Sequence, residues 1–553
     1  MSFSYTARAA MVSSLIEKPF DLLVIGGGIT GCGIALDAAL RGMRVALVEQ
    51  ADFASGTSSR STKLIHGGLR YLKQFELKLV HDVGRERSIV YRNARHIVIP
   101  EKMLLPIVKG GSLSASSTSI ALWVYDFLAG VRKKEVRKML SKPQTLTEEP
   151  LLNSEKVTGG GLYYEYRTDD ARLVIEIAKS AAASGALCLN YVQVIDLLYD
   201  THKAVSGVKV LDKISQQSFE IKAAQVVNAA GPFVDELRKT DQSLQDKRML
   251  LTKGVHIVVP YTSLPIRHAV YFDVADGRMI FAIPRNGITY IGTTDTVYTG
   301  TIAEPRATTD DVVYLINATN AMFPKVQLQT ADILSSWAGL RTLLNEAGKS
   351  PSELSRRDEV IVSPSGLVSI AGGKLTGYRL MASKVVDTIA TQLKAKGKAF
   401  AASSTHDYRL SGGEFHTEAD LETFAEKITH SAQYDYITST IRHSWVYRYG
   451  SNTEKLLSIA EKLRGRFVDT DQFTLAAEMQ YCFENELCTS EIDFAIRRTG
   501  MLYFDKVRLD LHLDFIHQYY STLLERSSAE GAETYRLFKA AVAAVTDFGS
   551  SSE

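Results

Sequence analysis

A glycine-rich turn near the start of the chain constrains its fold more than any other feature. Residues 21–31 read DLLVIGGGITG, in which an apolar run leads into the pattern Gly-x-Gly-x-x-Gly. The apolar run predicts a buried strand, and the alanine- and leucine-rich segment 29–40 predicts a helix. A second apolar strand is expected at 44–48, and Glu49 stands at its end. This order of strand, glycine turn, helix, strand and acid is typical of a βαβ unit that binds a dinucleotide.

The parts of this motif have separate physical tasks. Gly26 allows the tight turn, Gly28 lets a pyrophosphate approach the backbone, and Gly31 lets the helix pack close to the strand. The start of the helix presents unpaired N–H groups and the positive end of its dipole to the phosphates. Glu49 can accept hydrogen bonds from both hydroxyls of a ribose, which favours an adenosine without a 2′-phosphate. The motif therefore predicts a nucleotide site, and it leaves FAD and NAD as alternatives.

Composition and charge narrow the possible functions. The chain has 553 residues, enough for roughly two to four domains, and its formal net charge of +2 is too mild to indicate a nucleic-acid partner. The cysteines form no C-x-x-C pair and no histidine cluster accompanies them, so we expect reduced packing residues in a cytosolic setting and no metal site. The N-terminal segment predicts a short amphipathic helix rather than a signal peptide, and no apolar run is long enough to span a membrane.

Side-chain hydroxyl groups are concentrated one element after the glycine turn. Residues 57–63 read TSSRSTK, and residues 64–72 continue as LIHGGLRYL. Hydroxyl groups at this place can bind the phosphate and ribitol oxygens of a long cofactor, and the backbone at His66, Gly67 and Gly68 can approach a flat ring closely. A polar run of this kind is otherwise a solvated loop or a helix cap. Its position directly after the nucleotide turn favours FAD over NAD.

Two segments late in the chain end in small residues, as strands that pass close to a cofactor do. Residues 225–233 read QVVNAAGPF, and residues 370–379 read IAGGKLTGYR, a strand that ends in two glycines before a helix. The start of that helix, aimed at the N1–C2=O side of a flavin, would stabilise the anionic reduced ring. A strand expected at 187–194 would bring the backbone of Val192 against an adenine. Cofactor-facing segments this late in the chain are what an FAD fold requires.

The remaining pattern indicates two further domains. Frequent turns between strand-like runs in 251–300 predict a large antiparallel sheet, and after about residue 400 the apolar residues recur at helical spacing. We predict an α/β fold with a doubly wound, Rossmann-like FAD-binding domain, an antiparallel β-sheet substrate domain and an all-α C-terminal domain. The FAD-binding domain is placed at 19–75, 155–235 and 335–398, the substrate or cap domain at 76–154 and 236–334, and the helical domain at 399–553.

The stretch from Thr57 to Leu72, placed after Gly26-Gly27-Gly28, resembles the FAD-dependent, aerobic and quinone-linked glycerol-3-phosphate dehydrogenase family. The resemblance extends over residues 20–380, roughly, and the helical region follows. It implies that sn-glycerol 3-phosphate transfers a hydride from C2 to N5 of FAD and becomes dihydroxyacetone phosphate. Because the chain has no second glycine motif for a nicotinamide, the expected electron acceptor is a quinone or oxygen. The oxidase branch of the family typically carries an extra insertion and this chain is compact, so the resemblance favours a membrane quinone, with oxygen as the alternative. An amino-acid oxidase of the same fold is a further alternative, which would need a carboxylate-binding arginine and an apolar pocket. A non-enzymatic flavin- or nucleotide-binding module is another, and it predicts that no substrate bleaches the flavin.

The resemblance also implies roles for individual residues. An alcohol needs a base to remove its hydroxyl proton, and His256 is the first candidate and His66 the second. Arg341 is expected to bind the C2 oxygen, and neighbouring cations supply donors for a dianionic phosphate. The expected substrate-binding residues are Arg70, Tyr71, Arg341, Arg356 and Lys374, with Arg357 as the alternative to Arg356. The expected FAD-binding residues are Gly26, Gly28, Ile29, Thr30, Gly31, Glu49, Thr57, Ser58, Ser61, Lys63, Leu64, His66, Gly67, Gly68, Val192, Ala230, Gly231, Gly373, Lys374, Leu375 and Thr376.

One segment has a composition that suits a membrane surface. Aromatic and apolar side chains at 120–128 are followed by a basic run at 132–138. Such a segment is either a core helix with a solvated basic end or a helix that lies on an anionic membrane. We expect a cytoplasmic protein that associates peripherally with the inner face of the cell membrane. The C-terminal helices carry no motif of chemistry, and they are candidates for homodimer contacts, membrane contacts or packing alone.

Overall fold

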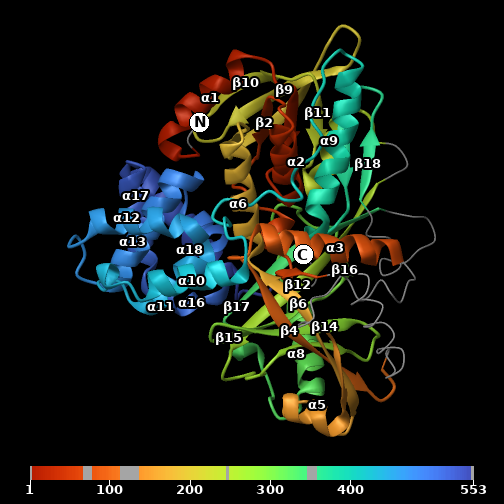
Figure 1. The fold of residues 1–553 in the computed structure, drawn as a ribbon, viewed down its shortest axis with the longest axis vertical. Coiled ribbons are helices and arrows are strands. Elements are labelled where there is room, and N and C mark those ends of the chain that lie inside the picture. Colours follow the sequence, from red (N-terminus) through yellow and green to blue (C-terminus); the bar gives the residue numbers. More distant parts are fainter. Residues whose placement is uncertain (1–2, 67–76, 112–135, 245–247, 345–357, 550–553) are drawn as a thin grey trace.

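A computed structural model of the chain describes residues 3–66, 77–111, 136–244, 248–344 and 358–549. The C-terminal helices, cyan to blue in Figure 1, form a block to one side of the sheets. Within the described ranges, no helix combines the length and the hydropathy that crossing a bilayer requires. All four cysteines are buried with free thiols, as predicted; they are Cys32, Cys188, Cys482 and Cys488.

A six-stranded sheet forms the centre of the nucleotide-binding half. Its order is β18-β19-β11-β1-β2-β7, and all neighbouring strands are parallel except the edge pair of β18 and β19. The strands are β1 (Leu22–Ile25), β2 (Val45–Val48), β7 (Leu187–Leu189), β11 (Val226–Asn228), β18 (Glu359–Val362) and β19 (Val368–Ala371). Every residue of β1 and β2 is buried, which means that both faces of the sheet are covered. The predicted doubly wound domain is confirmed.

Helices and a small second sheet complete this half of the molecule. The helix α2 (Ile29–Leu40) packs against α6 (Asp170–Ala183) and α9 (Tyr378–Lys394), and these helices lie in the upper part of Figure 1. The N-terminal segment forms the expected helix, α1 (Arg8–Glu17), and α7 (Val234–Thr240) follows β11. The small sheet has the order β10-β9-β8, and its strands are β8 (Val192–Tyr199), β9 (Val205–Asp212) and β10 (Gln217–Lys222).

A ten-stranded sheet forms the other half, and it contains the expected antiparallel pairs of the substrate domain. Its main path is β16-β12-β15-β14-β13-β4-β6-β3, with β17 paired to β12 and β5 paired to β6, and only β4 and β13 are paired in parallel. The strands are β3 (Leu64–Ile65), β4 (Val98–Val108), β5 (Lys138–Ser141), β6 (Val157–Thr168), β12 (Met249–Pro260), β13 (Ala269–Asp273), β14 (Met279–Arg285), β15 (Ile288–Gly292), β16 (Thr296–Val297) and β17 (Ser335–Leu344). The helices α5 (Lys142–Glu148) and α8 (Thr309–Met322) belong to the same half, whereas α3 (Leu77–Asn93) lies between the two halves, against residues 375–377 and β4 (Figure 1).

Three segments expected in the FAD-binding domain are strands of the ten-stranded sheet, and the first of them is β3, which pairs with β6. Residues 157–168 form β6, which pairs with β4 along its whole length, and residues 335–344 form β17, which pairs with β12 from Met249 to Val258. A strand follows the partner that satisfies its backbone N–H and C=O groups, and here the partners lie in the large sheet. Sheet membership therefore does not follow the sequence boundaries placed at 75, 155 and 335, whereas the three kinds of domain are as predicted.

The C-terminal region is helical, as predicted. Its helices are α10 (Glu418–Thr429), α11 (Ser439–Tyr449), α12 (Thr453–Leu463), α13 (Thr470–Glu486), α14 (Glu491–Asp493), α15 (Met501–Phe504), α16 (Lys506–Leu511), α17 (Leu513–Leu523) and α18 (Ser528–Ala544). A π-helical segment, Phe494–Arg498, continues α14. Buried aromatic side chains such as Trp445, Tyr449 and Tyr481 fill the core between these helices.

The close contact predicted at the third glycine of the motif is present and gives a test of the fold. A Cβ atom on Gly31 would lie 1.9 Å from the carbonyl oxygen of Gly26, so Gly31→Ala would force α2 away from β1. We expect this substitution to lower the free energy of unfolding by roughly 1–3 kcal/mol, measured by chemical denaturation. Gly377→Ala is the matched control, because its Cβ would meet no atom within 4 Å. Equal denaturation midpoints for the two variants would contradict the expected need for close packing.

Candidate active site

Residues from both large sheets line a cavity of about 1110 Å³. The glycine turn of β1 and α2 forms part of the wall, and β12 and β17 of the ten-stranded sheet form another part. The loops at 229–233 and 372–376 line it as well. The cavity therefore joins the predicted nucleotide motif to the predicted substrate residues.

The glycine turn has the geometry that a bound phosphate group needs. Gly26 has a φ of +111°, a conformation that favours glycine, and a Cβ there would lie 2.5 Å from the carbonyl oxygen of Ala229. Gly28, Ile29 and Thr30 line the cavity at the start of α2, where the helix dipole favours an anion. Gly31 lies behind this surface and acts through helix packing rather than through the cavity wall.

Glu49 lies at the cavity as predicted, on a loop that its own carboxylate organises. Its oxygens accept hydrogen bonds from the N–H of Gly27 at 2.7 Å, the N–H of Ala51 at 2.9 Å and the hydroxyl of Ser55 at 3.3 Å. Burial raises the pKa of Glu49, and these hydrogen bonds oppose the rise. Val192 lines the cavity beside Glu49, and its N–H donates to the backbone oxygen of Glu49 at 2.8 Å. A carboxylate has about four acceptor positions, so it retains capacity for a ribose hydroxyl.

The hydroxyl-rich loop lines the cavity, except for one residue that the sequence predicted to bind FAD. Thr57, Ser58, Ser61, Leu64 and His66 are all part of the cavity wall. The side chain of Lys63 is instead buried behind the loop, with its ammonium 2.5 Å from the carboxylate of Asp170 and 3.0 Å from the backbone oxygen of Ser59. A buried carboxylate needs a cation or hydrogen-bond donors, and Asp170 at the start of α6 takes this one. Lys63 thus supports the loop and does not line the cavity.

The late segments reach the cavity where the sequence placed them. Ala230, Gly231, Gly373, Lys374, Leu375 and Thr376 all line it. The hydroxyl of Thr376 donates to the backbone oxygen of His66 at 3.1 Å, which brings together two predicted segments that are 310 residues apart. This contact closes the wall between the hydroxyl-rich loop and the loop after β19.

His256 lies on β12 within the cavity wall, and its ring is held from several sides. Its Nε2 is 3.0 Å from the hydroxyl of Thr62, and the imidazole stacks on the indole of Trp337 at 4.8 Å between ring centroids. A Cβ on Gly292 would lie 2.1 Å from the ring, so this strand neighbour has to be glycine. Burial lowers the pKa of His256 well below its ordinary value, and the positive charges of Arg341 and Lys63 lower it further. The imidazole is therefore neutral at neutral pH.

Arg341 on β17 points into the same cavity and is fixed by the segment after β15. One guanidinium nitrogen donates to the backbone oxygen of Thr294 and to the carboxylate of Asp295, both at 3.1 Å. The other donates to the hydroxyl of Thr293 at 2.9 Å. A planar guanidinium held in this way presents its donors to a substrate in a single orientation. Register places Arg341 opposite Thr252 on β12, four residues from His256 on that strand.

Comparison with known proteins identifies the family. Residues 21–379 match the family model of FAD dependent oxidoreductases, and residues 403–530 match the C-terminal domain of alpha-glycerophosphate oxidase. The chain is 48% identical over 522 residues to the aerobic glycerol-3-phosphate dehydrogenase of Bacillus subtilis, covering 93% of this chain and 94% of that protein. It is 47% identical over 535 residues to the corresponding protein of Staphylococcus haemolyticus, covering 96% of each. The chain belongs to the aerobic glycerol-3-phosphate dehydrogenase family.

Solved structures agree with this family assignment. The glycerol-3-phosphate dehydrogenase of Bacillus halodurans, complexed with FAD, superposes with a TM-score of 0.85 at 40% identity, over 99% of both chains. The L-alpha-glycerophosphate oxidase of Mycoplasma pneumoniae, with FAD bound, gives a TM-score of 0.56 at 18% identity over 71% of this chain, which shows a shared fold. The expected fold class is confirmed along nearly the whole chain.

Some residues predicted for the site lie outside the described part of the chain, and some residues that line the cavity were not predicted. The predictions for Gly67, Gly68, Arg70, Tyr71, Arg356 and Arg357 lie outside the described residues and stay predictions. Sequence reasoning missed Arg60 and Thr62 of the hydroxyl-rich loop, and Thr293 and Asp295 after β15, which all line the cavity. The polar run GTTD at 292–295, directly after an apolar strand, is the signal that would have found the last two. In the described part of the chain, no group of three or more His, Cys, Asp or Glu side chains is arranged to hold a metal.

The lowered pKa of His256 predicts how acid affects stability. In the unfolded chain this histidine takes up a proton below about pH 6.5, whereas in the folded chain it stays neutral to a much lower pH. The unfolded state then binds more protons, so the free energy of unfolding falls as pH decreases, by up to about 1.4 kcal/mol for each pH unit. We expect His256→Asn to reduce this slope between pH 6.5 and 5 in urea denaturation. An unchanged slope in the variant would mean that His256 titrates normally when folded.

Proposed function

We propose that this chain oxidises sn-glycerol 3-phosphate to dihydroxyacetone phosphate with FAD as the hydride acceptor, and that the electrons pass to a membrane quinone. The observation that carries the proposal is a single cavity in which a dinucleotide turn faces His256, Arg341 and Lys374. The family assignment supports both the cofactor and the substrate, since relatives that share nearly half of their residues with this chain are aerobic glycerol-3-phosphate dehydrogenases.

The residues around the cavity fit FAD along its whole length. The turn from Gly26 to Thr30 and the hydroxyl of Ser58 suit the pyrophosphate, and Glu49 with Val192 suits the adenosine. At the other end, Gly373 has a φ of +86° and its neighbour Lys374 lines the cavity, so backbone and cation both approach the expected flavin position. When bound, FAD supplies the acceptor for the hydride.

His256 is proposed as the base that takes the C2 hydroxyl proton. Its buried, neutral imidazole is in the right protonation state at neutral pH, and the hydrogen bond to Thr62 and the stack on Trp337 fix its orientation. His66, which also lines the cavity, is the second candidate. The proton leaves the alcohol as its C2 hydride leaves for the cofactor, so the C2–O bond becomes a carbonyl.

Cationic side chains are proposed to bind the oxygens of the substrate. Arg341 would bind the C2 oxygen and favour its deprotonation, and Lys374 would hold the phosphate together with Arg70, Tyr71 and Arg356, which are assigned from the sequence. Several cations around a small ligand suit a dianionic phosphate better than the single carboxylate of an amino acid. The glycine oxidase of Geobacillus kaustophilus, with a TM-score of 0.51 at 20% identity, shares the fold only.

The acceptor, the membrane contact and the oligomeric state extend the proposal. A quinone is favoured because the chain has no second glycine motif for a nicotinamide, and the segment at 120–138 suits the inner face of the cell membrane. Oxygen is the alternative, supported by the match of residues 403–530 to a domain of an oxidase. A homodimer is proposed with the helical region as its candidate interface.

Anaerobic reduction of the flavin tests the proposed reaction directly. We expect the purified holoprotein to lose its oxidised flavin absorbance when sn-glycerol 3-phosphate is added without oxygen, and not when glycine is added. A quinone analogue in detergent should then restore the absorbance faster than dissolved oxygen does. Bleaching by glycine alone would move the assignment to amino-acid oxidation, and faster recovery with oxygen would make the chain an oxidase.

Removal of the Arg341 guanidinium tests its role. We expect Arg341→Ala to lower kcat/KM for sn-glycerol 3-phosphate by roughly 100- to 1000-fold, because it removes the donors proposed to stabilise charge on the C2 oxygen. The flavin should remain bound, since Arg341 lies on β17 of the ten-stranded sheet and is not part of the glycine turn. Arg306→Ala is a suitable control, because Arg306 is exposed and pairs only with the exposed Glu304. Normal turnover by Arg341→Ala would show that the substrate binds elsewhere.

A further inference from the structure

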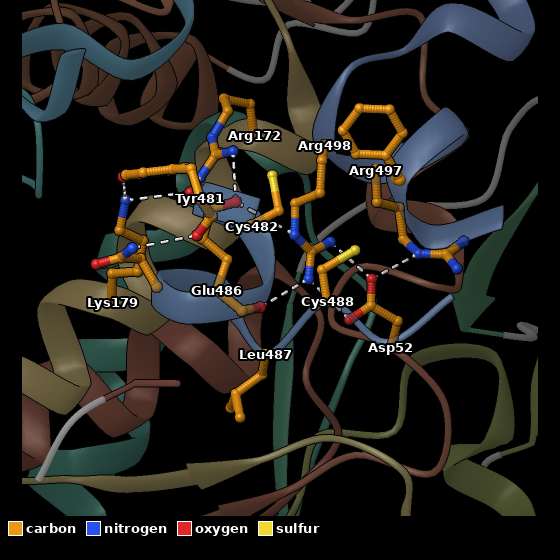
Figure 2. A network of polar contacts seen from close by, with 12 residues as sticks. Asp52, Arg172, Lys179, Tyr481, Cys482, Glu486, Leu487, Cys488, Arg497 and Arg498 are labelled. Atoms are coloured by element: carbon orange, nitrogen blue, oxygen red, sulfur yellow. Dashed lines mark hydrogen bonds and ion pairs between the residues drawn. The ribbon is translucent and has the colours of Figure 1, made fainter. Parts of the chain in front are cut away.

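A network of buried charges joins the helical C-terminal region to the loop that carries Glu49. Seven charged side chains take part, each less than one-tenth exposed, and Figure 2 shows most of them as sticks. They are Asp52, Arg172, Glu176, Lys179, Glu486, Arg497 and Arg498. Burial of so many charges is costly unless each one is paired, so the pairing has to be considered in detail.

Asp52 is the point at which the network meets the FAD-binding half. Arg498 forms a fork with its carboxylate, with nitrogen–oxygen distances of 2.7 and 3.1 Å, and Arg497 donates to the same group at 2.9 Å. Both arginines belong to the π-helical segment Phe494–Arg498 of the C-terminal region (Figure 2). Burial raises the pKa of Asp52, but the two guanidinium groups outweigh burial and hold the pKa below its ordinary value. Asp52 is thus a charged partner that depends on the C-terminal region.

At the other end of the network, Glu486 links Arg498 to the helix α6. Glu486, at the end of α13, binds Arg172 through two bonds of 2.5 and 2.9 Å and accepts from Lys179 at 3.2 Å. The backbone oxygen of Glu486 accepts from Arg498 at 2.9 Å. Arg172 and Lys179 both lie on α6, the helix that packs on α2. The position of Arg498 is therefore determined from both sides of the interface.

The loop 49–55 transmits this position to the cofactor-facing surface. Asp52 lies three residues after Glu49, and the backbone N–H of Ala54 donates to the oxygen of Gly27 in the glycine turn at 3.0 Å. The N–H of Ser55 donates to the oxygen of Asp52 at 3.1 Å, while the hydroxyl of Ser55 donates to Glu49. These hydrogen bonds couple the position of the loop to the position of the Glu49 carboxylate.

The strand that carries Val192 is held from the same side. The amide of Asn190 donates to Asp52 at 2.9 Å and to the backbone oxygen of Leu487 at 3.0 Å. The hydroxyl of the next residue, Tyr191, donates to Asp493 in the C-terminal region. Glu49 and Val192 are the two residues expected at the adenosine. Each thus lies within three residues of a side chain that bonds to the C-terminal region.

We propose that the helical C-terminal region retains the cofactor, with Arg497 and Arg498 as positioning residues that hold the loop 49–55 and the start of β8 in the conformation that binds the adenosine end of FAD. This inference rests on the proposed function only for the identity of the cofactor. It gives the helical region a role in the cofactor site, although that region contributes no residue to the cavity wall in the described part of the chain. By linkage, bound FAD stabilises the docked segment 486–498 by the same factor by which the docked segment strengthens FAD binding.

Two substitutions and a matched control test the proposal. Arg498→Lys keeps the charge but loses the fork, and Asp52→Asn keeps the size but removes the charge. Arg442→Lys is the control, because Arg442 is a buried arginine of the same region whose partners, Ser431 and Asp435, also lie in the helical block. We expect the dissociation constant for FAD, titrated into apoprotein by flavin fluorescence, to rise by roughly 5- to 150-fold in the first two variants and to stay within about twofold in the control.

Hydrogen–deuterium exchange tests the same proposal on the wild-type protein, so the test does not depend on whether the variants fold. Hydrogen–deuterium exchange of the wild-type protein should show faster exchange in 486–498 after FAD is removed, with little change in 439–449. Folded Arg498→Lys or Asp52→Asn that binds FAD as tightly as wild type would overturn the proposal, as would equal weakening by Arg442→Lys. If neither network variant folds, unchanged protection of 486–498 in apoprotein overturns it. Failure of the wild-type apoprotein to bind FAD would instead overturn the proposed function, so the two failures are distinguishable.

Discussion

The close approach of α2 to β1 at the glycine turn is the contact on which the rest of the structure depends. The backbone of Gly26 passes within contact distance of Ala229, and α2 lies against Gly26 at Gly31. No residue with a side chain fits these places, so the motif fixes the first strand, the first helix and the neighbouring strand β11 in one arrangement. The positive end of α2 then lies at the cavity, and the loops and strands that line the rest of the cavity enclose the same space.

The second half of the site depends on strand register rather than on a motif. β12 and β17 pair over ten positions, which places His256 and Arg341 along one wall at a separation that their sequence positions do not reveal. Because side chains alternate between faces of a strand, a shift of β17 by one residue would turn Arg341 away from the face that carries His256. Gly254, Gly292 and Gly339 leave room around these side chains and around Arg60, so small residues on neighbouring strands are part of the same arrangement.

Buried ion pairs connect the loops around the cavity to other parts of the molecule. Asp170 takes the ammonium of Lys63 and so orders the hydroxyl-rich loop, and Asp52 takes the guanidinium groups of Arg497 and Arg498 and so orders the loop after Glu49. Both carboxylates are fully buried, so removing Lys63, or removing both Arg497 and Arg498, would leave a buried charge without its cation. The two pairs lie behind the cavity wall, and their effect on a ligand passes through the backbone of the loops that they hold.

The sequence by itself determined the dinucleotide unit, the helical character of the C-terminal region and the main cofactor-facing segments of the cavity wall. These features depend on short-range rules: apolar periodicity, glycine at turns, and small residues at strand ends. The tertiary structure alone decided that β6 and β17 belong to the large sheet, that Lys63 pairs with Asp170, and that Thr62 holds His256. It also decided that Asp52 meets Arg498, which lies 446 positions away. Such pairings depend on which strand or charge is nearest after folding, and nothing within a local window of sequence specifies that neighbour.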